Sequence, residues 1–402
     1  MRAAIAIGSL ALLACGSSTE SGSTDSGGPD STMGDAPVES GPMPEAAADG
    51  GVDATADVTV GGDSATDAPE DIGIVTLPEA SADSGIVHPC QLPGTVQYTS
   101  SGVTVVGGGS TPAQLAFLEL PVGFCAHYYG TVGNARQIRI APSGEAFVAS
   151  PTTGTTGGGQ GGQSAIIVLP DDNKDGNADA PVTFLSGLPS TQGLMFVQGF
   201  LYYQDGTKVL RLPYTPGQRM GTGPGQTMID VTVYSSGIHW PKTFDVADDG
   251  TVYVGNGGDQ GESCVQPMPF HGGILKIDGT SDGAEIAMGL RNPIAVRCSR
   301  GHNLCFALEL AKDFSNGEGG REKLLPIHAG DNWGFPCCAT QNVPYSSVTP
   351  VPDCSSIVPE QDSFIIGDTP FGLDFEPGLW PAPYTGSAFV ATHGAAGSWV
   401  GA

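Results

Sequence analysis

The chain has 402 residues, with 15 Lys and Arg against 42 Asp and Glu, for a formal net charge of -27 at pH 7. This charge argues against nucleic acid or an anionic membrane face as a partner. Charged residues make up only 14% of the chain, whereas it contains 61 Gly and 32 Pro, a composition typical of many short strands joined by turns.

The N-terminus has the pattern of an export signal. Arg2 precedes an apolar run at residues 3–14 that is too short to span a bilayer. Residues 12–15 read LLAC, which resembles a bacterial lipobox; an ordinary signal peptide with an incidental cysteine is the alternative. We expect residues 1–15 to be a lipoprotein signal and Cys15 to be the lipidated residue. The protein would then be exported and anchored to the cell envelope, in the periplasm or at the outer membrane and cell surface.

Residues 16–88 differ from the rest of the chain. They are rich in Ser, Gly, Asp and Ala and contain no Lys, Arg, Phe, Tyr, Trp or Cys. Such a segment buries too little apolar surface to offset its ordering entropy, and its acidic residues repel one another. We therefore expect a disordered acidic tether, since no motif supports a specific acidic binding tail. The remaining residues 89–402 form the expected folded domain.

A hairpin pattern recurs along the domain. An alternating strand, a turn of Gly, Asp, Ser or Asn and a second strand rich in Val, Tyr, Phe or Ala occur at 136–149, 194–203, 243–254 and 293–307, with a looser copy at 371–391. Hairpins at a regular period predict an all-β fold of the β-propeller type, whereas the strands of a β-sandwich would not repeat in this way. Because a propeller closes its ring, either residues 90–132 supply a further blade or the sequence is cut short in its last blade.

Eight cysteines follow Cys15, an even number that indicates disulfides in an exported chain. Cys298 and Cys305 flank a turn and form the easiest local pair. Cys354 could pair with either Cys337 or Cys338. The absence of any C-x-x-C pair from the sequence argues against a zinc ribbon or a thioredoxin-like site.

The segment 171–179 reads DDNKDGNAD and carries oxygen ligands at positions 1, 3, 5 and 9 of a loop with glycine at position 6. This spacing resembles an EF-hand loop, although Val182 stands where a glutamate belongs. The interpretation is a weak Ca²⁺ site, and the alternative is a solvated Asp/Asn/Gly turn. The candidate ligands are Asp171, Asn173, Asp175, Asn177 and Asp179.

Four motifs in order carry a resemblance to a known family. They are GIHW at 237–240, GLRNP at 289–293, GDNWGFP at 330–336 and PYTGSAFVATHG at 383–394. Together they resemble the glucose/sorbosone dehydrogenases, which are six-bladed propellers that use pyrroloquinoline quinone (PQQ) and calcium. The resemblance covers roughly residues 118–402. It implies an oxidoreductase that takes a small sugar substrate and passes electrons to an acceptor.

The resemblance also implies roles for individual residues. His239 would be the general base, since a neutral imidazole accepts a hydroxyl proton near neutral pH, and Asp259 would orient it. Arg291, Asn292 and Gln192 would bind PQQ, Arg291 through its charged fork. The alternatives are a core histidine at 239, a turn-capping arginine at 291 and a simple turn residue at 192.

The chain also departs from the family pattern. Residues 309–313 read ELAKD, where the family has a Gly-Pro pair beside its calcium, and Phe335 replaces a tryptophan. The cationic residues that the family's last blades supply are not visible. A catalytically inactive surface propeller that serves as a binding or scaffold lipoprotein is therefore the alternative function. A calcium-dependent hydrolase ranks third, because no convergent set of carboxylates stands out.

Overall fold

The computed structural model describes residues 89–132, 135–151, 164–188, 191–230, 243–258, 264, 272–278, 283–312, 320–366, 368–378, 380 and 382–392. The expected signal, Cys15 and the tether lie outside the described residues. Strands dominate this part of the chain, and its only helices are the single-turn η1 (Pro89–Gln91) and η2 (Ala113–Leu115). Neither has the length or apolarity to cross a membrane. The all-β prediction is confirmed.

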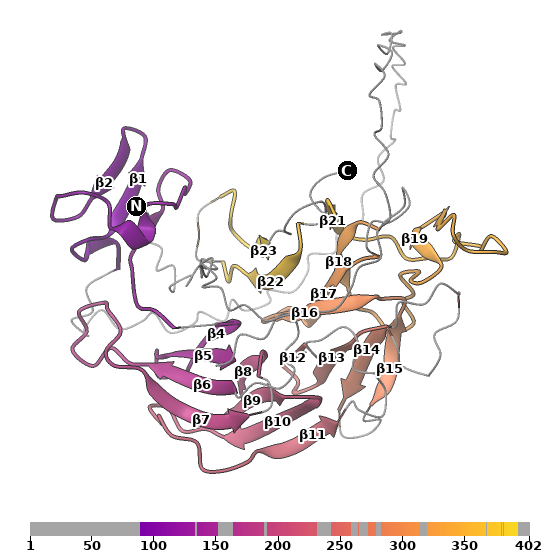
Figure 1. The fold of residues 1–402 in the computed structure, drawn as a ribbon, viewed down its shortest axis with the longest axis horizontal. Coiled ribbons are helices and arrows are strands. Elements are labelled where there is room, and N and C mark those ends of the chain that lie inside the picture. Colours follow the sequence, from indigo (N-terminus) through magenta and orange to yellow (C-terminus); the bar gives the residue numbers. More distant parts are fainter. Residues whose placement is uncertain are drawn as a thin grey trace, which may run out of the picture. The chain divides into compact units, whose positions relative to one another are not determined.

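Four four-stranded antiparallel sheets follow one another along the chain, and we call them sheets I to IV (Figure 1). Sheet I contains β4 (Gln137–Ile140), β5 (Ala146–Pro151), β6 (Ser164–Leu169) and β7 (Val182–Leu188). Sheet II contains β8 (Leu194–Val197), β9 (Phe200–Asp205), β10 (Lys208–Pro213) and β11 (Gln226–Asp230). Sheet III contains β12 (Phe244–Val246), β13 (Val252–Asn256), β14 (Gly273–Ile277) and β15 (Ala284–Met288). Sheet IV contains β16 (Asn292–Ser299), β17 (Leu304–Leu310), β18 (Glu322–Pro326) and β21 (Asp362–Phe364).

Three smaller sheets complete the described part. Strands β1 (Val96–Thr99), β2 (Gly102–Val105) and β3 (Cys125–Ala126) form a three-stranded sheet. Strands β19 (Cys338–Thr340) and β20 (Val343–Pro344) form a hairpin between β18 and β21, and β22 (Pro370–Phe375) pairs with β23 (Ala388–Thr392). Residues 90–132 therefore form a separate small sheet at the start of the domain.

The five repeated segments are antiparallel hairpins, as predicted. They correspond to β4–β5, β8–β9, β12–β13, β16–β17 and β22–β23. Their turns use residues that tolerate a left-handed backbone; Gly250, for example, has φ +89°. Each of the first four hairpins begins a four-stranded sheet.

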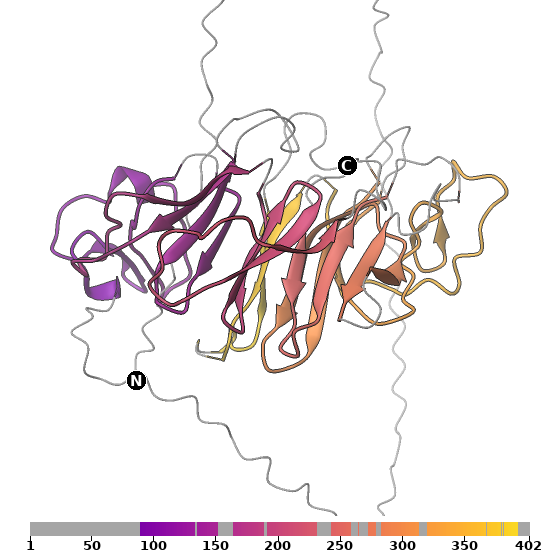
Figure 2. The same cartoon turned by 90° about the horizontal axis from the view of Figure 1, so that it is seen from below.

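The first strands of successive sheets lie next to one another. Strand β4 lies against β8, β8 against β12, β12 against β16 and β16 against β22. In Figure 1 these strands occupy the inner side of the arrangement, whereas β7, β11 and β15 lie toward its outer side. Figure 2 shows the sheets from the side, standing next to one another. The inner strands therefore bring residues far apart in sequence to a common centre.

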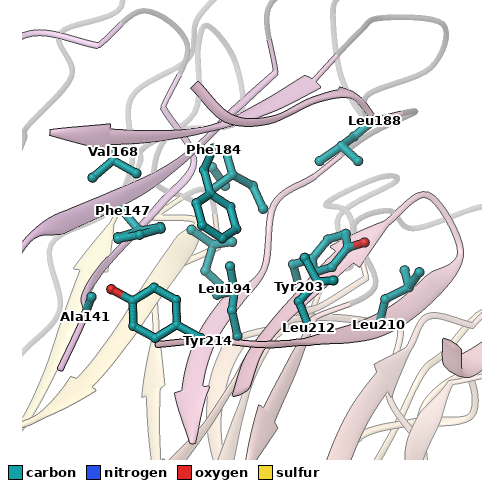
Figure 3. Packing of buried hydrophobic residues seen from close by; sticks show 13 residues of the cluster. Ala141, Phe147, Val168, Phe184, Leu188, Leu194, Tyr203, Leu210, Leu212 and Tyr214 are labelled. Carbon is teal, nitrogen blue, oxygen red and sulfur yellow. The ribbon is translucent and has the colours of Figure 1, made fainter. Parts of the chain in front are cut away.

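The core consists of apolar layers between neighbouring sheets. Side chains alternate along each strand, so in β9 Leu201 and Tyr203 pack toward sheet I while Tyr202 packs toward sheet III. Figure 3 shows the layer between sheets I and II, in which the fully buried ring of Phe147 lies 5.2 Å from that of Phe184. Equivalent layers join sheet III to sheet IV and sheet IV to the β22–β23 hairpin.

Four disulfides link the eight cysteines after Cys15. The predicted Cys298–Cys305 bridge is confirmed and closes the β16–β17 hairpin. Cys354 pairs with Cys338, one of the two partners predicted for it. The other two bridges are Cys90–Cys125 and Cys264–Cys337. The first of these ties the N-terminal 3₁₀ helix to β3.

Candidate cofactor site

The GLRNP and GDNWGFP motifs lie side by side. The Met288 and Asn332 backbones form a parallel bridge. Trp333 N donates to Met288 O at 3.0 Å, and Phe335 N donates to Gly289 O at 3.0 Å. Gly289 has φ +84°, and a Cβ there would lie only 2.7 Å from Trp333 N, so this close approach requires glycine. Two motifs that are well separated in sequence thus form one unit at the start of β16.

Arg291 is 8% exposed and is held by the ends of β16 and β17. Its backbone N–H donates to Glu309 Oε1 at 2.8 Å, and its Nη1 donates to Ala311 O at 2.9 Å. Glu309 also pairs with Lys323 Nζ at 3.2 Å, with both side chains at most 3% exposed. These contacts rigidly position Arg291, and they fit its predicted role as a structural cap as well as a ligand-holding role.

Sequence reasoning missed the buried Glu309–Lys323 pair beside Arg291. A signal was present, because Glu309 interrupts the apolar run FALEL in β17 and Lys323 precedes the apolar residues of EKLLP in β18. Buried charges of this kind are found where they are paired. Glu322 adds to the same network by accepting the Ala311 N–H at 2.9 Å.

Asn292 follows Arg291 at the first position of β16 and is 7% exposed. Its Oδ1 is buried and has no hydrogen-bond partner among the described residues. An unpaired buried acceptor is costly, by about 1–3 kcal/mol. The position therefore fits a ligand that brings an N–H or O–H donor. Together with the Arg291 guanidinium, it suits a cofactor such as PQQ that carries carboxylates, quinone oxygens and a ring N–H.

The residues after β17 suit calcium less well. Ala311 O accepts a hydrogen bond from Arg291, and Lys312 O accepts one from Gly320 N at 2.9 Å. These are two of the backbone oxygens that the resemblance would assign to a calcium ion. Each already accepts one hydrogen bond within the protein, so these two oxygens are less available to a calcium ion than unbonded carbonyls would be.

Gln192 lies two residues before β8, much as Arg291 lies just before β16. Its backbone N–H donates to Gln204 Oε1 of sheet II at 3.2 Å. Thr191 beside it is fully buried, and its Oγ1 has no hydrogen-bond partner in the described part of the chain. Gln192 and Arg291 are thus placed at the starting ends of two inner strands, in sheets II and IV. The predicted His239 and Asp259 lie outside the described residues.

The last family-like motif contributes β23 and an aromatic cluster. The Tyr384 ring lies 5.1 Å from that of Phe124, which is also 5.2 Å from the Trp380 ring. Phe389 of β23 completes the cluster, 4.8 Å from Trp380. The motif therefore packs the β22–β23 hairpin against the chain just before β3. Its final residues, from His393 onward, lie outside the described residues.

The predicted calcium loop at 171–179 is compact. The Asp171 carboxylate accepts the Asp175 and Gly176 N–H groups, both at 3.1 Å, and Asp175 Oδ1 accepts the Asn177 N–H at 2.8 Å. The Asn177 N–H holds the pKa of Asp175 below its ordinary value. Asn173 Oδ1 accepts from Asp175 N, and Asp179 accepts from Asp172 N. Across the residues that the structure describes, no three His, Cys, Asp or Glu side chains are grouped to hold a metal ion.

Comparison with solved structures gives distant likenesses. No protein-family model matches the sequence, and no curated protein does. An oxidoreductase (glucose dehydrogenase) of Thermus thermophilus is 15% identical with a TM-score of 0.47, covering 66% of this chain and 78% of that one. The PQQ-bound aldose sugar dehydrogenase of Streptomyces coelicolor is 15% identical with a TM-score of 0.45, covering 66% and 75%. The PQQ domain of Coprinopsis cinerea pyranose dehydrogenase is 15% identical with a TM-score of 0.47, covering 66% and 72%. Likenesses at this level do not establish an activity.

Proposed function

We propose that the protein is a quinoprotein oxidoreductase that oxidises an aldose or a sugar-derived aldehyde and passes the electrons to a separate acceptor. The observation that carries the proposal is the joining of the two family-like motifs around Arg291 and the unpaired Asn292 Oδ1. The order of the four motifs in the sequence supports it independently. The proposal assigns to this chain the cofactor bound in the Streptomyces coelicolor structure, but it rests on the motifs and the site.

In this proposal each residue has a separate task. PQQ, when bound, would supply an o-quinone able to accept a hydride from the sugar carbon. His239 takes the proton of the sugar hydroxyl on a neutral ring nitrogen, and Asp259 orients that imidazole. Arg291, Asn292 and Gln192 hold the cofactor. The internal hydrogen bonds of Arg291 keep its position fixed, which lowers the entropic cost of binding.

We propose further that the enzyme is held outside the cytoplasm by a lipid anchor. Residues 89–402 would form a six-bladed propeller, tethered by residues 16–88 to a lipid on Cys15. Four disulfides in the domain support an oxidising compartment outside the cytoplasm. Membrane contact would be through the lipid alone, and the acidic chain would not bind nucleic acid.

We also propose that the 171–179 loop binds Ca²⁺ weakly, using lone pairs that the backbone amides leave available on its Asp and Asn oxygens. Calorimetric titration with CaCl₂ tests this. Asp171→Asn and Asp175→Asn together should remove the binding heat, whereas Asp353→Asn, an exposed aspartate elsewhere, should not. Equal binding by both variants would contradict the assignment.

The alternative is a cofactor-free binding propeller. One observation favours it, namely that Arg291 and the two carbonyl oxygens after β17 are engaged within the protein. PQQ titration of the full chain, followed by absorbance and equilibrium dialysis, separates the two functions. The oxidoreductase proposal predicts saturable binding that Asn292→Leu weakens at least about tenfold, a loss equivalent to one good hydrogen bond to a charged or polar ligand.

A second pair of variants tests the catalytic assignment. His239→Ala should lower the rate of sugar oxidation by about 10²–10⁴-fold while PQQ still binds. His302→Ala, on an exposed turn after β16, should change neither property. Loss of PQQ binding in His239→Ala would refute the role of His239 as a base, and absence of PQQ binding by the unaltered chain would favour the binding propeller.

A further inference from the structure

One side chain from each inner strand belongs to a common layer, which we call the inner tier. Its members are Arg139 of β4, Met195 of β8, Asp245 of β12, Arg297 of β16 and Asp374 of β22. Each occupies the same place in its hairpin, one or two residues before the end of the first strand. Each also stands opposite an aromatic residue of the second strand, in order Phe147, Tyr202, Tyr253, Phe306 and Phe389.

Most of the inner tier is joined by charge-assisted contacts. Arg297 Nη1 donates to Asp245 Oδ2 at 3.1 Å, and Arg297 Nη2 donates to Asp374 Oδ1 at 3.0 Å. Arg300, in the turn after β16, donates to Asp245 Oδ1 at 3.0 Å and to Met195 Sδ at 3.2 Å. The Asp245 side chain is fully buried. Each carboxylate of the tier is therefore matched by an arginine, as a buried charge such as that of Asp245 requires.

Arg139 is the charged member of the inner tier that has no ion pair among the described residues. Its Nη1 donates to its neighbour's carbonyl, Ile138 O, at 2.8 Å. Its Nε is buried without a hydrogen-bond partner in the described part of the chain. Within that part the Arg297 and Arg300 ion pairs engage both tier carboxylates, Asp245 and Asp374, and Arg139 forms no ion pair of its own.

The pKa of Arg139 is consistent with its lack of an ion-pair partner in the described part of the chain. Burial lowers the pKa of Arg139 to about 9, and the like charge of Arg297 adds to the lowering, while Asp374 and Asp245 offset part of it. A guanidinium stays protonated in proteins. Arg139 therefore stays charged, and a bound anion would offset the free-energy cost of burying that charge.

We propose that Arg139 binds a small oxyanion, of carboxylate or phosphate type, at the inner tier. The planar guanidinium fork matches both kinds of anion. The site is separate from the candidate cofactor site, because Arg297 lies five residues beyond Asn292 along β16, roughly 16 Å at the rise of a strand. The inference does not depend on the proposed oxidoreductase function.

The experiment uses the full chain with sodium phosphate, sodium acetate and sodium chloride at matched ionic strength. Calorimetric titration measures binding, and thermal unfolding measures the stabilisation that binding confers. Phosphate or acetate should bind saturably and raise the unfolding temperature above that in chloride, and the stronger of the two identifies the oxyanion class. The Arg139→Gln variant should bind that anion at least about tenfold more weakly.

Two further variants serve as controls for Arg139→Gln. Arg136→Gln removes an exposed arginine three residues earlier in the same chain segment and should leave binding unchanged. Arg139→Lys keeps the charge, and it should fold and bind with reduced affinity even if Arg139→Gln does not fold. The proposal is overturned if neither oxyanion binds the unaltered chain better than chloride, or if an Arg139 variant binds as tightly as the unaltered chain.

Discussion

Arg297 donates to both carboxylate oxygens of Asp374, at 3.0 Å and 3.2 Å, across 77 residues of sequence. The contact links β16 of sheet IV to the β22–β23 hairpin. Burial alone would lower the pKa of Arg297, but Asp245 and Asp374 outweigh burial and hold that pKa above its ordinary value. Asp374 is 57% exposed whereas Asp245 is fully buried, so Asp245 is the partner that depends most on Arg297.

Replacing Arg297 should therefore destabilise the domain strongly. In Arg297→Gln the buried Asp245 carboxylate loses one of its two arginine partners and keeps Arg300. A buried charge left without any partner costs about 3–5 kcal/mol, so we expect a loss of up to about 3 kcal/mol. Lys208→Gln is the matched control, because its ion pair with Asp230 is exposed and such pairs contribute about 0–1 kcal/mol. Urea unfolding gives both free energies. Similar losses in the two variants would show that the inner tier does not stabilise the fold.

Gly289→Ala should separate the two motifs of the candidate site. The residue has a left-handed backbone, and its new Cβ would meet the Trp333 backbone, which cannot move without breaking the bridge. Gly301→Ala is the control, since it has φ +76° with open space around it and loses only the backbone term of about 1–2 kcal/mol. Unfolding free energies should be lower in Gly289→Ala by at least about 1 kcal/mol more than in Gly301→Ala. Equal losses of unfolding free energy in the two variants would mean that the domain tolerates separation of the two motifs.

The stability of the domain should depend on pH through His127. Burial lowers the pKa of His127 below the ordinary 6.5, with Gly176 and Asp175 opposing part of the effect. The folded state therefore binds fewer protons than the unfolded state, so the free energy of unfolding decreases as the pH falls through about 6.5. His127→Gln should flatten this decrease, and His302→Gln, at an exposed turn, should leave it in place. An unchanged slope in His127→Gln would exclude His127 as its source.

Each disulfide should contribute to the free energy of unfolding according to the length of the loop that it closes. Cys90–Cys125 spans 35 residues and Cys298–Cys305 spans seven. The chain-entropy model assigns about 4 kcal/mol to the longer loop and about 2.5 kcal/mol to the shorter one. Guanidinium unfolding of the two Cys→Ser double variants measures the difference. A larger loss on removing Cys298–Cys305 would indicate that packing around the buried hairpin bridge outweighs loop entropy.

The hairpins and the partners of two disulfides could be predicted from the sequence because they depend on residues close together in the chain. Alternation and turn glycines determine a hairpin such as β12–β13, and Cys298 and Cys305 flank one turn. The inner tier could not be predicted in this way. Asp245 and Asp374 appear as single charges in short apolar strands, and only the packing of sheet III, sheet IV and the β22–β23 hairpin brings them to Arg297.

The candidate site was predictable in part. The motifs identified Arg291 and Asn292, but their adjacency to Trp333 and Phe335 follows from a backbone bridge between distant segments. After β17 the sequence already departs from the family's calcium-binding pattern. The hydrogen bonds of Ala311 O and Lys312 O could not be predicted, since backbone carbonyl partners leave no mark on the sequence. Thr191 was missed for a similar reason, because a buried hydroxyl in a turn has no distinctive spacing.

Sugar-dependent dye reduction by the full chain, loaded with PQQ and calcium, tests the proposed function most directly. We predict that an aldose or a sugar aldehyde reduces the dye with the unaltered protein, and that the rate falls by about 10²–10⁴-fold in His239→Ala, as expected for loss of a general base. No dye reduction with any aldose or sugar aldehyde, by a chain that circular dichroism shows to be folded, would contradict the assignment as a quinoprotein oxidoreductase.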